Sequence, residues 1–145
     1  WLKMISFYEE DLTVLKKRAQ YKKVFDNFDA KKIIKYDEAK RKELMNDAGI
    51  VRNRLKINAV IENAKALLKV KEEFGSFDKY LWSFVDGKAL TNQDFKKATA
   101  ISETMSKTLK KRGFRFVGPT ICYAFMQAIG LINDHTPDCF RAKEI

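Results

Sequence analysis

The sequence predicts an all-α protein, folded as one compact helical bundle, and three observations support this prediction. Apolar residues recur at helical spacing along nearly the whole chain. No segment of four to eight residues alternates cleanly between apolar and polar side chains, or is rich enough in β-branched residues, to predict a strand. The chain has 145 residues, of which 46% are hydrophobic, and this length and composition suit a single domain with its own core.

Three helices are expected in the first half of the chain. The first spans about Leu12–Phe28. A charged helix follows over Asp37–Asp47 and is expected to end at Gly49. The clearest helix begins after Asn53, a residue type that caps helices, and continues to Phe74. Its apolar stripe predicts that it packs centrally, through Ile57, Val60, Ile61, Ala64, Leu67 and Leu68.

The second half is predicted to hold one short helix and two longer ones. Ser76 is expected to cap the short helix, whose aromatic residues face inward. The longest irregular connection is expected to begin at Asp86 and to reach about Ala100. Two helices then follow over Ile101–Lys111 and Pro119–Gly130.

The most informative segment lies between these last two helices, at residues 110–120, Lys-Lys-Arg-Gly-Phe-Arg-Phe-Val-Gly-Pro-Thr. Gly113 fits the position just after a helix, and Gly118 with Pro119 fits the start of the next one. The arrangement is a helix-hairpin-helix, in which the second helix offers unpaired N–H groups to a phosphate. Three cations stand beside it: Lys110, Lys111 and Arg112. The pattern alone fits equally well an ordinary helix end with cations that complement the helix dipole.

The charge of the chain points to a polyanionic partner. The formal net charge is +10, from 29 Lys and Arg against 19 Asp and Glu. No apolar run approaches the roughly 18 residues of a membrane span, and no secretion or lipidation signal occurs. Charge alone also fits an anionic membrane surface, but the hairpin makes a membrane-bound helical protein the weaker alternative, so we expect no membrane partner. Two cysteines do not make a disulfide framework. We therefore expect a cytoplasmic protein that acts as a monomer.

Five segments carry a further signal when they are taken in order: Thr13–Arg18, Asp47–Ile57, Leu81–Val85, Leu109–Tyr123 and Gly130–His135. Each segment is a weak signal alone. Together, at similar spacing, they resemble the DNA-3-methyladenine glycosylase I family, the constitutive alkylation-repair glycosylases of bacteria. The resemblance covers about Leu12 to Cys139.

The resemblance implies a helix-hairpin-helix DNA glycosylase fold and a monofunctional enzyme that excises 3-methyladenine from alkylated duplex DNA by hydrolysing its N-glycosidic bond. Such an enzyme flips the damaged nucleotide out of the stack, so it must hold the phosphates firmly. The alternative function is a non-catalytic helix-hairpin-helix DNA-binding module. In either case the expected DNA-binding residues are Lys110, Lys111, Arg112, Gly113, Gly118 and Thr120. Arg52, Arg54 and Lys56 are weaker candidates. For Lys56, a solvated position at the start of a helix is the better interpretation.

The only histidine, His135, stands four residues before Cys139. From the residues alone this pair is half a metal site, and the absence of a metal is the better interpretation, because structural zinc normally has four protein ligands. In the resembled family such a pair joins a Cys and a His near the N-terminus to hold one zinc ion. The resemblance therefore implies that His135 and Cys139 bind a structural zinc ion, with the other two ligands upstream of Trp1. Asp134 is expected to cap a helix or to hydrogen-bond to His135.

The resemblance also implies a base pocket with a carboxylate, and here the sequence departs from the family. The family loop Gln-Ala-Gly-Leu-Ser-Trp has no counterpart, because Tyr8–Leu12 leads directly into Thr13. We expect Glu9 to be the catalytic carboxylate, with Glu10 as the second candidate, although two solvated acids at a helix end fit the composition equally well. Because the chain opens at Trp1, we expect a single domain over 1–145 that lacks an N-terminal segment and a short loop near residues 8–12.

Overall fold

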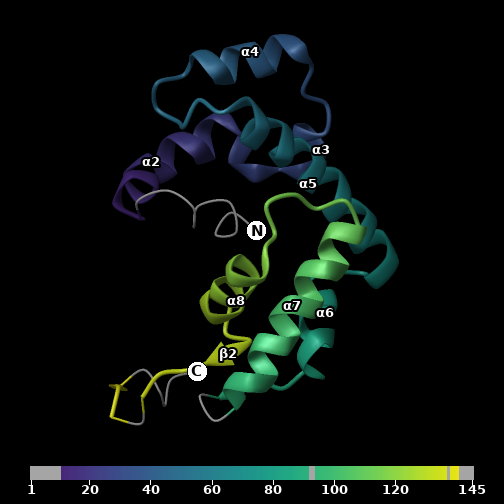
Figure 1. The fold of residues 1–145 in the computed structure, drawn as a ribbon. Coiled ribbons are helices and arrows are strands. Elements are labelled where there is room, and N and C mark those ends of the chain that lie inside the picture. The colour runs from purple at the N-terminus through teal and green to yellow at the C-terminus, as the bar shows by residue number, and fades with distance from the viewer. Residues whose placement is uncertain (1–10, 92–93, 137, 141–145) are drawn as a thin grey trace.

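The computed structural model describes residues 11–91, 94–136 and 138–140, and these form the helical fold expected from the sequence (Figure 1). None of the described helices is long and apolar enough to cross a membrane. With η for a 3-10 helix, the described elements are α2 (Asp11–Val24), η1 (Asp26–Phe28), α3 (Ala30–Ile33), α4 (Glu38–Asn46), α5 (Arg54–Phe74), α6 (Phe77–Trp82), η2 (Ser83–Val85), β1 (Leu90–Thr91), α7 (Phe95–Lys111), α8 (Pro119–Ala128) and β2 (Ile132–Asn133).

The longest helix, α5, belongs to two hydrophobic cores. Its first half contributes Ile57, Val60, Ile61 and Ala64 to a core shared with α3, α4 and the segment after α2. Its second half contributes Ala66, Leu67 and Val70 to a core shared with α6, α7 and α8. Figure 1 shows α5 running from the part of the molecule that carries α4 to the part that carries α6. The predicted central position of this helix is confirmed.

Three helix starts predicted from the sequence are present. The Asn53 side chain accepts a hydrogen bond of 3.1 Å from the N–H of Lys56 at the start of α5. The Ser76 hydroxyl accepts one of 3.0 Å from the N–H of Lys79 in α6. Pro119 is the first residue of α8 and follows Gly118 at the N-cap position.

The first predicted helix ends earlier than expected, at Val24. The three residues of η1, Asp26–Phe28, have positive φ angles of 52°, 55° and 60°, which a right-handed helix cannot contain. The Tyr36 hydroxyl donates to the Asp26 carboxylate at 2.6 Å, and the Phe25 ring stacks on the Phe28 ring with 5.9 Å between centroids. The end of α2 is therefore accompanied by contacts of Asp26 and Phe25 with residues that follow the helix, Tyr36 and Phe28.

The prediction that Gly49 ends the charged helix is wrong. Helix α4 ends at Asn46, and Gly49 is not among the glycines with a positive φ. The Asp47 carboxylate instead accepts hydrogen bonds from the Gly49 N–H at 2.6 Å and from the Gln20 side chain at 2.7 Å. Gly49 is required by close packing, because a Cβ at this position would lie 2.5 Å from Cγ of Gln20.

The connection after η2 is shorter and more regular than predicted. Strands β1 and β2 form a parallel pair of two residues each, which corrects the expectation of a chain without strands. Helix α7 begins at Phe95, so the irregular segment does not reach Ala100. The apolar signal of this first part of α7 is weak because Ala98 is the only buried residue among 95–100.

Helix α7 ends at Lys111, and Gly113 follows its C-cap residue as predicted. The Phe114 N–H donates to the Leu109 carbonyl and the Gly113 N–H to the Lys110 carbonyl, both at 3.0 Å. These two bonds form a Schellman motif, in which the glycine is left-handed, and Gly113 has a φ of 95°. The buried Phe114 and Leu109 side chains complete it. This helix end begins the hairpin.

The two glycines of the hairpin are expected to respond differently to substitution. Gly113→Ala should lower the free energy of unfolding by about 1 kcal/mol, because alanine is strained at a positive φ. Gly118 has a φ of −66° and open space around a Cβ, so Gly118→Ala is its matched control. Urea unfolding of both variants tests this, and an equal loss in the two would contradict it.

Candidate nucleic-acid interface

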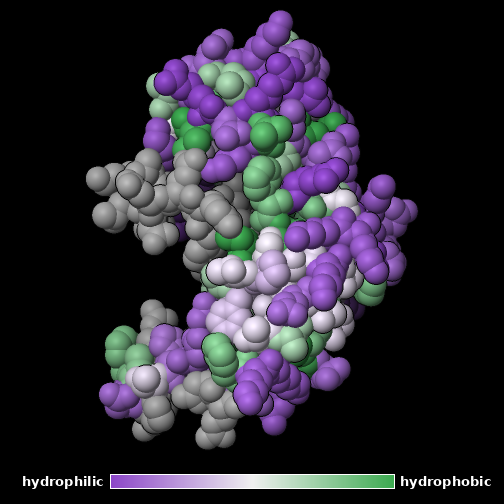
Figure 2. Space-filling view, viewed as in Figure 1, coloured by the Kyte–Doolittle hydropathy of each residue, from purple (hydrophilic) through white to green (hydrophobic). Residues whose placement is uncertain are grey.

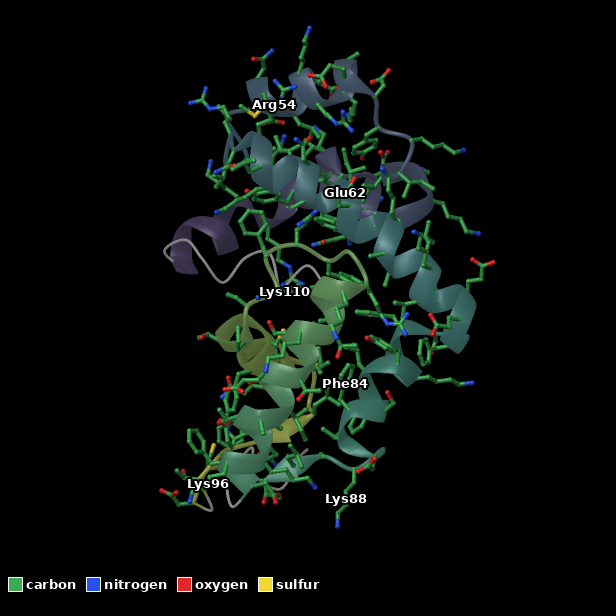
Figure 3. All side chains as sticks on the ribbon, turned by 45° about the vertical axis from the view of Figure 1, so that its right-hand side comes forward. Arg54, Glu62, Phe84, Lys88, Lys96 and Lys110 are labelled. Carbon is green, nitrogen blue, oxygen red and sulfur yellow. The ribbon has the colours of Figure 1, made fainter. Side chains whose placement is uncertain are left out.

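The hairpin between α7 and α8 combines two buried anchors with an exposed tip. Phe114 and Val117 are 2% and 1% exposed and sit in the core, whereas Arg115 and Phe116 reach solvent. Lys110 lies at the end of α7, where the hairpin begins (Figure 3). The space-filling view shows that the molecule is hollowed beside α8, the helix into which the hairpin leads (Figure 2).

Asn63 of α5 fixes the backbone of the hairpin tip. Its side-chain oxygen accepts a hydrogen bond of 2.7 Å from the Arg115 N–H, and its amide donates one of 3.2 Å to the Arg115 carbonyl. Asn63 is only 3% exposed. A buried amide with both ends satisfied holds a unique geometry, because any shift would leave polar groups unpaired out of water. The tip is thereby positioned relative to the central helix.

A second set of contacts fixes the backbone at Val117. The buried Ser106 hydroxyl of α7 donates to the Val117 carbonyl at 2.6 Å. The Cys122 thiol of α8 donates to the same oxygen, with 3.7 Å between sulfur and oxygen. Burial raises the pKa of Cys122 to about 11, so this thiol stays protonated as a donor. Both helices of the motif therefore hold the hairpin between them.

The first turn of α8 is open to an anion. Gly118 at the N-cap has no side chain, and no side chain caps this helix start in the described structure. The first N–H groups of a helix have no partner within the helix, and the helix dipole makes this end positive. Thr120, in this turn, is exposed. A phosphate oxygen is a suitable partner for such N–H groups.

The three cations at the end of α7 are not equivalent. Lys110 and Lys111 are exposed, whereas Arg112 is half-buried. The two terminal nitrogens of Arg112 donate to the Glu73 carboxylate at 2.5 and 2.9 Å. The guanidinium also lies 5.0 Å and 5.1 Å from the ring centres of Phe74 and Tyr80.

The pair of Arg112 and Glu73 braces the end of α7 against the end of α5. The hydrogen bond from Arg112 lowers the pKa of Glu73, and the same bond raises the pKa of Arg112. Both groups therefore stay charged. The structure thus gives Arg112 a protein partner, whereas its role in DNA binding stays a prediction.

The weaker candidates around the start of α5 also differ in their surroundings. Arg52 is exposed. Arg54, labelled in Figure 3, donates to the Glu38 carboxylate at 2.8 Å, which joins α5 to α4. Lys56 is half-buried in the first turn of α5. The positions of Arg52, Arg54 and Lys56 do not test whether these residues contact DNA, so that role stays a prediction.

The predicted zinc ligands lie next to each other. Cys139 Sγ is 3.6 Å from His135 Nδ1. Two such ligands on one tetrahedral zinc ion are separated by about 3.5 Å, given Zn–S and Zn–N bonds of roughly 2.3 and 2.0 Å. The pair therefore fits a shared metal ion. Asp134 bonds elsewhere, since its carboxylate accepts from the Gln127 amide at 2.5 Å. The described residues contain no cluster of three or more metal-binding side chains.

The two candidate carboxylates, Glu9 and Glu10, lie outside the described residues. Their role stays a prediction from the resemblance.

Three residues that position the hairpin escaped the sequence analysis: Asn63, Glu73 and Ser106. Asn63 falls on the apolar stripe of α5, three residues after Val60 and four before Leu67. A polar residue on a buried helix face needs a hydrogen-bond partner, so this position could have signalled a contact. Glu73 and Ser106 gave no such signal, because their partners depend on how α5, α7 and the hairpin pack.

A helix-hairpin-helix that is pinned to its central helix, with two lysines beside an uncapped helix start, defines a protein of the helix-hairpin-helix class. Within that class, the sequence model of the methyladenine glycosylase family matches residues 5–142. The chain belongs to this family.

Relatives with known names and structures agree with this membership. The DNA-3-methyladenine glycosylase 1 of Escherichia coli K12 is 46% identical over 133 residues, which are 88% of this chain and 71% of that one. The DNA-3-methyladenine glycosylase of Haemophilus influenzae is 44% identical over 133 residues, which are 88% and 72% of the two chains. A solved variant of 3-methyladenine DNA glycosylase I in complex with 3-methyladenine has a TM-score of 0.86 and 33% identity, and covers 96% of this chain and 77% of that one.

Asn63→Ala is expected to lower the free energy of unfolding by about 2 kcal/mol, because it leaves the Arg115 N–H and carbonyl without partners. The control is Asn58→Ala on the same helix, where the side-chain oxygen is buried without a hydrogen-bond partner in the described structure. This control should change the free energy by less than about 0.5 kcal/mol. Denaturant unfolding measures both, and a loss as small for Asn63 as for Asn58 would refute the clamp.

Proposed function

We propose that this protein is a monofunctional DNA glycosylase that flips 3-methyladenine out of alkylated duplex DNA and hydrolyses its N-glycosidic bond, a step of base excision repair. The observation that carries the proposal is the pinned hairpin ahead of an uncapped helix, in a chain that belongs to the methyladenine glycosylase family. The identity of 46% to an enzyme of this name supports the substrate.

The hairpin would hold the DNA backbone beside the lesion. Flipping a nucleotide costs a few kcal/mol, so phosphate contacts must offset that cost. In the proposal, Lys110 and Lys111 contact phosphates through their ammonium groups, and the N–H groups around Thr120 bind a phosphate oxygen. Gly118 supports this role, because nothing lies within 4 Å of a Cβ built there and a phosphate can approach. Gly113 supplies the left-handed turn that leads the chain to this site.

The chemistry needs little acid catalysis. The bond between the sugar C1′ and the base breaks, and its electron pair neutralises the cationic 3-methyladenine as it leaves. A water oxygen then bonds to C1′ and releases a proton. A carboxylate beside the sugar stabilises the positive charge that develops there. We propose Glu9 for this carboxylate, with Glu10 as the second candidate.

We also propose that His135 and Cys139 hold one structural zinc ion, with two further ligands expected upstream of Trp1. The 3.6 Å between their ligand atoms supports this assignment. Such an ion would link the segment after β2 to the segment that carries the other ligands. The ion would take no part in the reaction. Damaged double-stranded DNA is the proposed partner, bound by a monomer in the cytoplasm, and both the monomeric state and the location stay predictions.

The function is tested by incubating the protein, with any residues that its gene encodes before Trp1, with methylated duplex DNA. Free 3-methyladenine should appear in the supernatant by chromatography. Glu9→Gln should slow this release by about 100-fold or more, as expected for the loss of a group that stabilises developing charge. Tight DNA binding without any release would instead favour the non-catalytic DNA-binding module.

Salt titration separates the three cations of the hairpin. Lys110→Ala and Lys111→Ala should each reduce the slope of log K against log salt by about 0.9, the value for one lost phosphate contact. Arg112→Gln should change this slope by less than about 0.3, because its guanidinium is held by Glu73. A drop of about 0.9 for Arg112→Gln would show that Arg112 contacts a phosphate directly.

Metal analysis tests the zinc site. The chain with any residues that its gene encodes before Trp1 should carry about one zinc ion per molecule, and His135→Ala and Cys139→Ser should each remove it. Cys122→Ser is the matched control, because Cys122 is a buried thiol that donates to a carbonyl. Zinc retained by both His135→Ala and Cys139→Ser would exclude these ligands.

A further inference from the structure

Phe116, at the tip of the hairpin, combines two unfavourable features. Its φ is 56°, a left-handed value that is strained for a bulky side chain. Its side chain is 49% exposed, although a phenylalanine gains most when it is buried. Strained residues persist only where their surroundings hold them, and they cluster at functional sites.

The contacts on both sides of Phe116 hold it in this state. The residue before it, Arg115, is fixed by both of its backbone groups to Asn63. The residue after it, Val117, is buried and fixed at its carbonyl by Ser106 and Cys122. Between these two fixed neighbours, the chain passes through a left-handed conformation at Phe116. The ring of Phe116 is exposed between two residues whose backbones are held by the core.

The surroundings of Phe116 indicate what the ring contacts. It lies two residues before Gly118, the N-cap residue of α8, and follows the lysines at the end of α7. Among the described residues, the other large exposed apolar side chains are Leu55, Phe95 and Phe140, and each belongs to another segment of the chain. A single ring beside a phosphate site suits a nucleic acid, since sugars and bases offer apolar faces to stack on.

Resting on the proposed function, we infer that Phe116 is a DNA-contacting residue of the hairpin, whose ring packs against a sugar or base of the strand whose phosphates the hairpin holds. Its contribution is apolar and hence independent of salt. The clamps from Asn63 and Ser106 position the ring before DNA arrives, so binding loses little freedom of this side chain.

The test measures the binding of a duplex that contains an abasic-site analogue, together with thermal unfolding. Phe116→Ala and Phe116→Gly should weaken binding by about 10-fold, within the range for one lost stacking contact, without changing the slope of log K against log salt. Phe116→Tyr should stay within about two-fold of the unchanged protein, because it keeps the ring.

Thermal unfolding distinguishes a DNA contact from a packing residue. Phe116→Gly removes the left-handed strain, so its Tm should not fall and should rise by up to about 3 °C. Phe95→Ala is the matched control, since Phe95 is an exposed phenylalanine on the first turn of α7. This control should bind DNA as the unchanged protein does.

Two results would overturn the inference: full binding by Phe116→Ala, or a fall in Tm by more than about 4 °C in Phe116→Gly. Failure of the unchanged protein to bind DNA would overturn it as well. If the unchanged protein binds DNA but releases no 3-methyladenine, the proposed function fails, whereas weaker binding by Phe116→Ala would still support the contact.

Discussion

The hydrogen-bonded pair between the Asn63 side chain and the backbone of Arg115 is the contact on which the geometry of the interface depends. Asn63 stands on α5 beside Ala64, the last residue of this helix in one hydrophobic core, and three residues before Ala66, its first residue in the other. A helix held in two cores is a rigid reference for anything attached to it. Because the amide is buried, releasing the hairpin would leave polar groups unpaired away from water. The core thereby fixes a loop that is otherwise on the surface.

The three cations at the end of α7 have different surroundings. Arg112 joins the ends of α5 and α7 through Glu73, and its planar guanidinium also covers two aromatic rings. Lys110 and Lys111, the two residues directly before Arg112, are exposed to solvent. One of these three neighbouring cations therefore has a protein partner, whereas the two lysines are the ones proposed to bind phosphates. A bidentate ion pair combined with stacking on aromatic rings suits the planar guanidinium of arginine. The flexible ammonium group of lysine suits contact with a phosphate.

The hairpin also shows how a stable core can hold an unfavourable conformation at its surface. Phe114 and Val117 are buried and Arg115 is bonded, so the strain of the loop collects at Phe116. The free energy of the surrounding contacts offsets this strain. The Schellman motif at Gly113 and the proline that opens α8 need no such support, because each residue is suited to its own backbone angles.

Much of the fold followed from the sequence by itself. Four helix boundaries were predictable, because each depends on residues within one helical turn: the start of α5 after Asn53, the cap at Ser76, the end of α7 before Gly113 and the start of α8 at Pro119. The segment order, with its resemblance to the methyladenine glycosylases, also pointed to the family. Among the candidate site residues, the pairing of His135 with Cys139 reflected their spacing of four residues.

Only the tertiary structure decided the rest. The early end of α2 depends on Tyr36, and the role of Gly49 depends on Gln20, which lie far from them along the chain. Asn63 and Arg115 are 52 residues apart, and Glu73 and Arg112 are 39 apart. No local pattern encodes such pairs. Packing between helices determines which of the three neighbouring cations pairs with another residue of the protein, because only packing brings the partners within hydrogen-bond distance. It also determines which residue of the hairpin has the strained backbone.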